Sequence, residues 1–260
     1  MLFKYMTVTL LIICAASTAV YAADSEVLWL VNRDNRLSST YHPYDLVTYQ
    51  GIKLRQSAYD AFLSMQKALQ TAGIHNLRLQ SAYRSYEHQA AIFNQRVKEL
   101  QAAGYIRTEA ERKAALSIQP PGASEHQLGL ALDVSVDGKL TQDFGETETG
   151  KWLAAHCHEF GFVIRYPQAK TNITQIIYEP WHLRYVGTPH AAIMKNLSLT
   201  LEEYAAYVKA AGAYVFWIDD NNYFLLSHTN TLPADESNSS STSPQKNGYI
   251  TTKQKVYPQI

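Results

Sequence analysis

Two short stretches of the sequence each combine a histidine with a carboxylate. One reads SEHQLGLALD and contains His126 and Asp133; the other reads EPWH and contains Glu179 and His182. A catalytic zinc ion usually takes three nitrogen or oxygen ligands from the protein and keeps a fourth position for water. His126, Asp133 and His182 fit the three ligand positions, and Glu179 fits a base that reaches the water without binding the metal. The chain must then fold so that two segments far apart in the sequence meet at one point.

Taken one at a time, these residues do not indicate a metal, because a buried histidine or carboxylate usually just bonds to nearby backbone groups. The joint pattern is more informative. SxHxxGxAxD followed by ExWH is long and tightly spaced, and both parts are present in full. The pair of motifs therefore favours a metal site over four unrelated buried polar groups.

Residues 1–22 have the pattern of a secretory signal peptide. Lys4 precedes the apolar stretch MTVTLLIICAASTAV, and Val20 and Ala22 stand at the minus-three and minus-one positions of a cleavage site. An uncleaved membrane anchor is the alternative, although the apolar run is shorter than the roughly 20 residues that a span needs. We expect cleavage, export to the periplasm, the cell wall or the medium, and no stable membrane span in the mature chain.

Charge and cysteine content exclude two classes of protein. The 23 basic and 23 acidic residues cancel, so the sequence lacks the basic excess that nucleic-acid binding requires. Cys14 lies in the predicted leader, which leaves Cys157 alone in the mature chain. An internal disulfide is therefore excluded, and we expect Cys157 to be a small buried side chain on a helix.

Apolar periodicity predicts a mixture of helices and strands without regular βαβ alternation, which indicates an α+β fold. Ser57 with Asp60, and Thr108 with Glu111, resemble capping boxes at two helix starts. Pro180 predicts a sheet edge or a bulge. The expected helices are 57–72, 86–103, one starting at 108, 149–160 and 201–211; the expected strands are a short one within 28–37, then 77–84, 128–136, 162–167 and 176–187.

The last part of the chain has a different composition. A hairpin is expected around residues 219–222, a polar and Ser-rich linker over 229–248, and a final strand returning to the hairpin. We therefore divide the chain into a signal peptide (1–22), a catalytic domain (23–204) and a C-terminal extension (205–260).

The motifs resemble those of the VanY-type D-alanyl-D-alanine carboxypeptidases, a zinc peptidase group that includes VanX dipeptidases and is related in fold to the Hedgehog signalling domain. The resemblance covers roughly residues 28–204, including LWLVNRDNRL, YRS, RYP and EPWHLRYVG. It implies helices packed on an antiparallel sheet that carries one Zn²⁺ per chain. It also implies that the zinc ligands are His126, Asp133 and His182, with Glu179 as the catalytic base.

The same resemblance assigns a substrate pocket. It implies that Arg84 and Gln89 hold the terminal carboxylate of the substrate or stabilise its scissile carbonyl, and that Ser124 bonds to the substrate. A guanidinium suits the first task because its planar fork binds a carboxylate through two donors. Without the metal motifs, Arg84 would be interpreted as part of a surface salt bridge and Gln89 as part of a solvated helix face.

The expected function is removal of the C-terminal D-alanine from peptidoglycan stem peptides by an exported, monomeric zinc enzyme. An L,D-carboxypeptidase or a D,D-dipeptidase acting on the same material would carry the same motifs. A further alternative is a zinc-stabilised module that binds wall peptides without cutting them. Glu179 argues against that module, because binding alone needs no base beside the metal.

Overall fold

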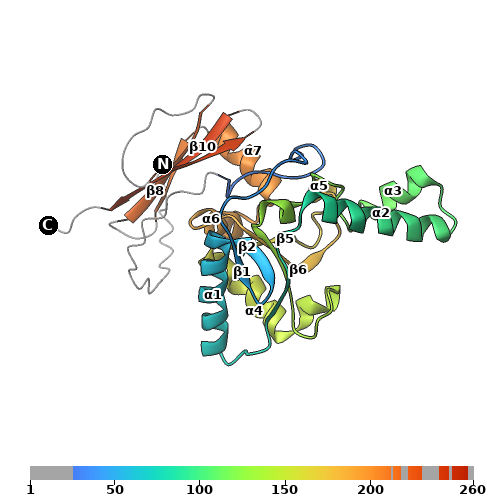
Figure 1. Ribbon diagram of the computed structural model, residues 1–260. Helices are drawn as coiled ribbons and strands as arrows, with labels where there is room; N and C mark the ends of the chain where they lie inside the picture. Colours follow the sequence, from blue (N-terminus) through green and yellow to red (C-terminus); the bar gives the residue numbers. More distant parts are fainter. Residues whose placement is uncertain (1–25, 212, 218–221, 230–239, 246–247, 257–260) are drawn as a thin grey trace. The chain divides into compact units, whose positions relative to one another are not determined.

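The computed structural model describes residues 26–211, 213–217, 222–229, 240–245 and 248–256 (Figure 1). Two compact units are present, one over Glu26–Ala206 and one that includes the described residues from Tyr207 onward. The predicted signal peptide lies outside the described residues. Within the described part of the chain, no helix is long and apolar enough to cross a membrane.

The first unit contains a four-stranded antiparallel sheet in the order β3-β4-β6-β5, and a separate two-stranded hairpin, β1-β2. Helices surround the larger sheet (Figure 1). The predicted α+β class is thus confirmed. The strands are β1 (Leu46–Tyr49), β2 (Ile52–Arg55), β3 (Arg78–Ser81), β4 (Ala131–Ser135), β5 (Phe162–Tyr166) and β6 (Glu179–Tyr185).

The predicted helices are present, but both capping boxes are wrong. The chain enters the first helix directly from β2, so the N-cap falls on Arg55, without a side-chain cap bond. The third helix begins with Ile106 as N-cap, which places Thr108 inside it. The helices are α1 (Gln56–Thr71), α2 (Tyr86–Ala102), α3 (Arg107–Ala114), α4 (Glu148–His156), α5 (Thr171–Thr174), α6 (His190–Leu197) and α7 (Leu201–Ala211), with 3₁₀-helices η1 (Glu125–Leu128), η2 (Gln142–Glu146) and η3 (Cys157–Phe160).

The strand expected within residues 28–37 is wrong, because this segment consists of turns and bends. Its backbone groups bond to side chains and to backbone groups of turns and loops instead of to a neighbouring strand. The guanidinium of Arg184 donates to the carbonyls of Val27 (2.9 Å) and Trp29 (3.2 Å), and Asn32 Oδ1 accepts from the backbone of Asn35. Satisfied in this way, the segment needs no sheet partner.

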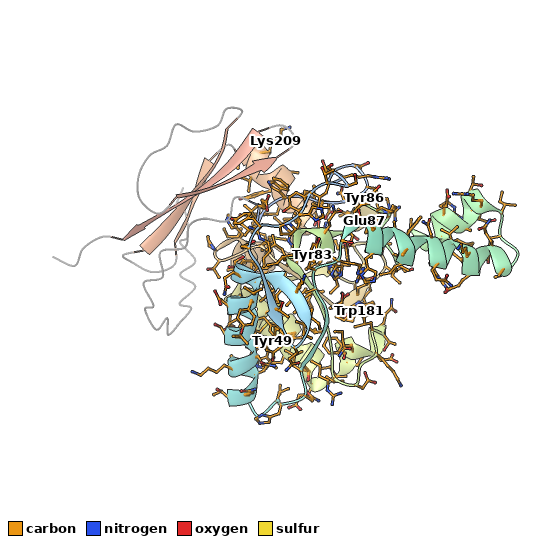
Figure 2. All side chains as sticks on the ribbon, viewed as in Figure 1. Tyr49, Tyr83, Tyr86, Glu87, Trp181 and Lys209 are labelled. Atoms are coloured by element: carbon orange, nitrogen blue, oxygen red, sulfur yellow. The ribbon has the colours of Figure 1, made fainter. Side chains whose placement is uncertain are left out.

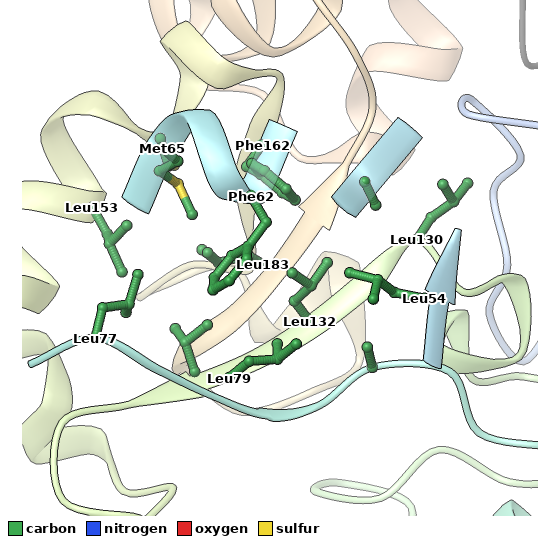
Figure 3. Close-up of a cluster of buried hydrophobic side chains, with 14 of the residues drawn as sticks. Leu54, Phe62, Met65, Leu77, Leu79, Leu130, Leu132, Leu153, Phe162 and Leu183 are labelled. Carbon is green, nitrogen blue, oxygen red and sulfur yellow. The ribbon is translucent and has the colours of Figure 1, made fainter. Parts of the chain in front are cut away.

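The core lies between α1 and one face of the larger sheet (Figure 3). Phe62 and Met65 of α1 face Leu132 of β4 and Leu183 of β6, and all four are fully buried. Burying a side chain of this size contributes about 1.5–3 kcal/mol. Cys157 belongs to the same cluster, and burial raises the pKa of its thiol to about 12, which confirms the structural role expected for it.

The second unit is a four-stranded antiparallel sheet in the order β7-β8-β10-β9. The predicted hairpin and the returning final strand are confirmed, whereas the predicted linker is wrong in part, because it contains β9, whose backbone pairs with β10. A ladder needs only backbone groups, and Pro244 is tolerated because β9 is an edge strand. The strands are β7 (Ala213–Trp217), β8 (Asn222–Thr229), β9 (Ser240–Gln245) and β10 (Gly248–Val256).

Candidate active site

The register of the larger sheet brings the two motifs together. Asp133 of β4 pairs directly with His182 of β6. Because successive side chains on a strand point to opposite faces, Leu132 and Leu183 enter the core while Asp133 and His182 share the other face. The apolar pattern that fixes the core thus also fixes which residues meet on the functional face.

A bulge in β6 brings Glu179 to the same face. The Ile164–Leu183 and Tyr166–Glu179 pairs are two residues apart on β5 but four apart on β6. The extra residues of β6 include Pro180, and strand irregularities of this kind re-aim side chains near active sites. Since β6 lies between β4 and β5, the edge position considered for Pro180 is wrong and the bulge is confirmed. Glu179 Oε2 lies 3.7 Å from His182 Nδ1.

His126 comes from η1, immediately before β4. Its Nδ1 lies 2.6 Å from the carbonyl oxygen of Ala82, and its Nε2 lies 3.1 Å from Asp133 Oδ2. The carbonyl can only accept, so Nδ1 carries the proton and Nε2 is left with a free lone pair. Gly129 ends η1 with φ +72°, a conformation that turns the chain into β4 and that glycine adopts without strain.

His126, Asp133 and His182 form a buried cluster whose potential ligand atoms all lie within 4.8 Å of one another. The two imidazole rings meet edge to face, with centroids 5.0 Å apart. Burial alone would raise the pKa of Asp133, but the two histidines outweigh it and hold this pKa well below its usual range. The arrangement offers two nitrogens and an anionic oxygen to a cation.

Glu179 differs from Asp133 in its electrostatic environment. Burial raises the pKa of Glu179 to about 7, an effect that the charge of Asp133 reinforces and that His182 and Arg84 oppose. A carboxyl group with a pKa near neutrality can both take up and release a proton at working pH. The cluster therefore combines one carboxylate that stays ionised with one suited to proton transfer.

Arg84 and Gln89 form a connected pair beside the cluster. The guanidinium of Arg84 bonds to Gln89 Oε1 (2.8 Å) and Ser81 Oγ (3.1 Å), and it lies 3.4 Å from Asp133 Oδ2. Gln89 is buried, and its Nε2 donates to the carbonyl of Gln119 (2.6 Å). Both ends of the Gln89 amide are thus engaged within the protein, and the solvated helix face considered for Gln89 is excluded.

Ser124 and Tyr83 are close in the chain to residues of the site. Ser124 is buried as the N-cap of η1, two residues before His126. Tyr83 follows β3, next to Arg84, and its hydroxyl lies 3.3 Å from His42 Nδ1. In Figure 2, Tyr83 lies near Tyr86 and Glu87 at the start of α2.

Sequence reasoning missed an ion-pair network behind His182. Glu125 is fully buried; its Oε1 accepts a hydrogen bond from Arg165 (2.7 Å) and forms an ion pair with Arg184 (3.1 Å), and both arginines are also buried. Arg165 in turn binds Glu202 of α7 through two donors, at 2.6 and 2.9 Å. The two arginines thus support the cluster from within the protein. The one feature of the sequence that pointed to this network was the position of Glu125 next to His126.

Comparison with known proteins places this geometry in a family. The model of the family described as VanY, D-alanyl-D-alanine carboxypeptidase, matches residues 51–188. The chain belongs to the VanY family. The matched stretch contains both histidine motifs, Glu179 and the Arg84–Gln89 pair.

Two curated relatives of this VanY-family chain come from other bacteria. The YodJ protein of Bacillus subtilis (strain 168) is 40% identical over 196 residues, which cover 70% of this chain and 68% of YodJ. The D-alanyl-D-alanine carboxypeptidase of Enterococcus faecalis (strain ATCC 700802 / V583) is 37% identical over 179 residues, which cover 68% of this chain and 65% of that protein. The chain thus spans about two thirds of the length of either relative.

Several solved structures share the fold of this VanY-family chain. The LdcB LD-carboxypeptidase is 39% identical with a TM-score of 0.62, covering 69% of this chain and 86% of LdcB. VanYB in complex with D-alanine-D-alanine is 36% identical with a TM-score of 0.63, covering 69% of this chain and 97% of VanYB. A VanY mutant from the VanB-type resistance cassette, solved with Zn(II), is 36% identical with a TM-score of 0.62, covering 69% of this chain and 98% of the mutant.

Proposed function

We propose that this protein is an exported zinc carboxypeptidase that removes the C-terminal D-alanine from peptidoglycan stem peptides. The observation that carries the proposal is the buried His126–Asp133–His182 cluster with Glu179 3.7 Å from His182. Membership of the VanY family supports the reaction class, and the relative solved with D-alanine-D-alanine supports the substrate.

The donor set fits a catalytic zinc ion. His126 Nε2, a carboxylate oxygen of Asp133 and His182 Nδ1 would hold one ion per chain, with room for a further ligand. Asp133 Oδ1 is buried without a hydrogen-bond partner among the described residues, as expected of an oxygen reserved for a cation. When bound, zinc supplies a Lewis acid that activates water and polarises the scissile carbonyl.

Glu179 performs the proton transfers. Its carboxylate takes the proton from the attacking water and then gives it to the departing amine, so that D-alanine leaves with a neutral amino group. A pKa of about 7, raised by burial, suits both steps. The base thereby returns to its starting state after each turnover.

Arg84 holds the end of the substrate. Gln89 and Ser81 fix two of its donors, so the guanidinium is orientated before substrate arrives. Its fork then binds the terminal carboxylate or the developing negative charge on the scissile carbonyl. Gln89 acts through Arg84, and Ser124 donates to the substrate from the N-cap of η1. A pocket that requires a free carboxylate selects the last residue of a chain.

The chain organisation belongs to the same proposal. Residues 1–22 direct export and are removed, residues 23–204 form the catalytic domain, and residues 205–260 form the extension. The mature protein acts as a monomer in the cell wall, outside the cytoplasmic membrane.

A second candidate activity is L,D-carboxypeptidase action on tetrapeptides. The specific observation in its favour is the 39% identity to LdcB, described as an LD-carboxypeptidase. Both activities use the same metal ligands and base, so only the shape of the pocket separates them.

One experiment tests the reaction and its specificity together. The purified mature protein is incubated with pentapeptide and tetrapeptide muropeptides, and mass spectrometry identifies the products. We expect loss of D-alanine from the pentapeptide; cleavage of the tetrapeptide alone would establish the L,D activity instead. Glu179→Ala should abolish hydrolysis while zinc remains bound, because it removes the base and keeps the ligands.

The exposed Glu159 on η3 supplies the matched control. Glu159→Ala should keep wild-type turnover and zinc content. If Glu179→Ala retains wild-type turnover, Glu179 is not the base.

A further inference from the structure

Two buried polar atoms face each other behind the His126–Asp133–His182 cluster. Glu125 Oε2 lies 3.9 Å from His182 Nε2, and neither atom has a hydrogen-bond partner among the described residues. A buried donor and acceptor that do not bond to each other reduce the stability of the fold, because both groups have already lost their hydrogen bonds to water. A movement of about 1 Å, as the ligands close on a cation, would bring the pair to hydrogen-bond length.

The carboxylate of Glu125 is held in a fixed position. Its other oxygen, Oε1, lies 2.7 Å from Arg165 Nε and 3.1 Å from Arg184 Nη1. Arg165 is held by Glu202, and Arg184 by the carbonyls of Val27 and Trp29. Arg165 donates to Oε1 and Arg184 is ion-paired with the same oxygen, so Oε2 is left to accept from His182.

The opposite side of the His182 ring faces the cluster. Its Nδ1 lies 3.2 Å from Asp133 Oδ1 and 3.7 Å from Glu179 Oε2. A neutral imidazole has one protonated nitrogen and one with a lone pair. If the proton were on Nδ1, His182 could not bind a cation there; with the proton on Nε2, the lone pair of Nδ1 points to the site.

We infer that Glu125 is a positioning residue that accepts a hydrogen bond from His182 Nε2 and so makes Nδ1 the metal-binding atom. The inference rests on the proposed zinc site and adds a residue to it. His126 shows the mirror arrangement, since the Ala82 carbonyl holds its Nδ1–H and leaves Nε2 for the metal. A partner on the outer nitrogen sets the tautomer, the ring orientation and the basicity of a ligand histidine.

Glu125→Gln tests the inference because the amide reverses the polarity at one atom. The amide oxygen would remain beside the two arginines, where Arg165 Nε donates to it, and the NH₂ group would face His182 Nε2. Two donors would then oppose each other, which favours the tautomer that cannot bind through Nδ1. We expect zinc affinity, measured by competition with a chromophoric chelator on the mature chain, to fall about 10- to 100-fold.

Glu202→Gln is the matched control. Glu202 binds the same Arg165 but makes no contact with His182 that the structure records. This variant should keep the wild-type zinc affinity, whereas a merely structural role of the network would lower affinity in both variants. Thermal unfolding of the metal-free proteins reports whether each variant folds.

A second measurement uses the unmodified protein and does not depend on the folding of a variant. Long-range ¹H–¹⁵N NMR of the zinc-loaded chain distinguishes protonated from metal-bound ring nitrogens, with His182→Gln used for assignment. We expect a proton on His182 Nε2 and zinc on Nδ1. Zinc on Nε2, or wild-type zinc affinity in a folded Glu125→Gln protein, would overturn this inference but not the proposed function. A wild-type chain that binds no zinc would overturn the proposed function together with it.

Discussion

At the scale of single residues, the candidate site depends on which atom of each side chain is free. His126 has its Nδ1 engaged by the Ala82 carbonyl, and Arg84 has two donors engaged by Gln89 and Ser81. The same Arg84 Nη2 that donates to Ser81 also reaches Asp133 Oδ2 (3.4 Å), and the other ring nitrogen of His126, Nε2, lies 3.1 Å from that oxygen. Preorganisation of this kind matters because the protein does not have to reorganise during the reaction.

Arg84→Lys should lower kcat/KM for the pentapeptide by about 100-fold, the size typical for loss of one donor to a developing charge. Lysine keeps the positive charge but lacks the planar fork that reaches Gln89 and Asp133 together. Steady-state kinetics measure the effect. The control is Arg96→Lys on α2, where the side chain is exposed and pairs with Glu99; it should retain wild-type kinetics. A wild-type kcat/KM in Arg84→Lys would remove Arg84 from the site.

At the scale of secondary-structure elements, the site depends on irregularities more than on regular structure. The bulge in β6 brings Glu179 beside His182. The left-handed Gly129 ends η1 so that β4 can begin at Ala131. Ideal geometry at either place would move a functional side chain away from the cluster.

Gly129→Ala should reduce the free energy of unfolding for two reasons. A residue with a Cβ pays about 1–2 kcal/mol at this positive φ, and the added Cβ would lie 3.0 Å from Arg55 Cγ and 3.1 Å from Leu46 Cδ2. Gly104→Ala isolates the first cost, because Gly104 has φ +97° and no neighbour within 4 Å of the added Cβ. Urea denaturation should show the larger loss for Gly129→Ala. Equal losses would mean that the contacts at Gly129 cost nothing.

At the scale of the whole molecule, folding buries several ionisable groups together with the apolar core. His190 of α6 is one that lies apart from the metal cluster. It is buried, and its Nδ1 lies 2.8 Å from the hydroxyl of Tyr204 on α7. The neutral ring is stabilised in this environment and the charged ring is not.

The stability of the fold should therefore depend on pH through His190. Burial lowers its pKa to about 3, whereas a histidine in an unfolded chain titrates near about 6.5. Between these values the unfolded chain binds more protons than the folded chain. The free energy of unfolding should thus fall as pH drops from about 6.5 toward about 3, by up to about 1.4 kcal/mol per pH unit.

His190→Gln removes this contribution. Urea denaturation at about pH 7 and about pH 4.5 should show a smaller loss of stability for His190→Gln than for the wild type. Other titrating groups act equally on both proteins and cancel in the comparison. The same loss in both proteins would show that His190 does not titrate in this range.

The sequence by itself was sufficient for the α+β class, most helix and strand positions and the convergence of two motifs. These depend on local periodicity and on residues close together in the chain. It misplaced the helix starts assigned to Ser57 and Thr108. The first helix follows directly from β2 and takes its N-cap, Arg55, from that strand, whereas α3 begins after a turn with Ile106 as its N-cap.

Only the tertiary structure decided how the His126–Asp133–His182 cluster is supported. Glu125, Arg165 and Arg184 come from three separate elements, and no spacing pattern in the sequence connects them. Their role depends on burial: a charge removed from water must find an opposite charge, and the fold determines which one it meets. Residue order thus determined which groups could bind a metal. The packing of distant arginines around Glu125 determined which nitrogen of His182 faces the metal site.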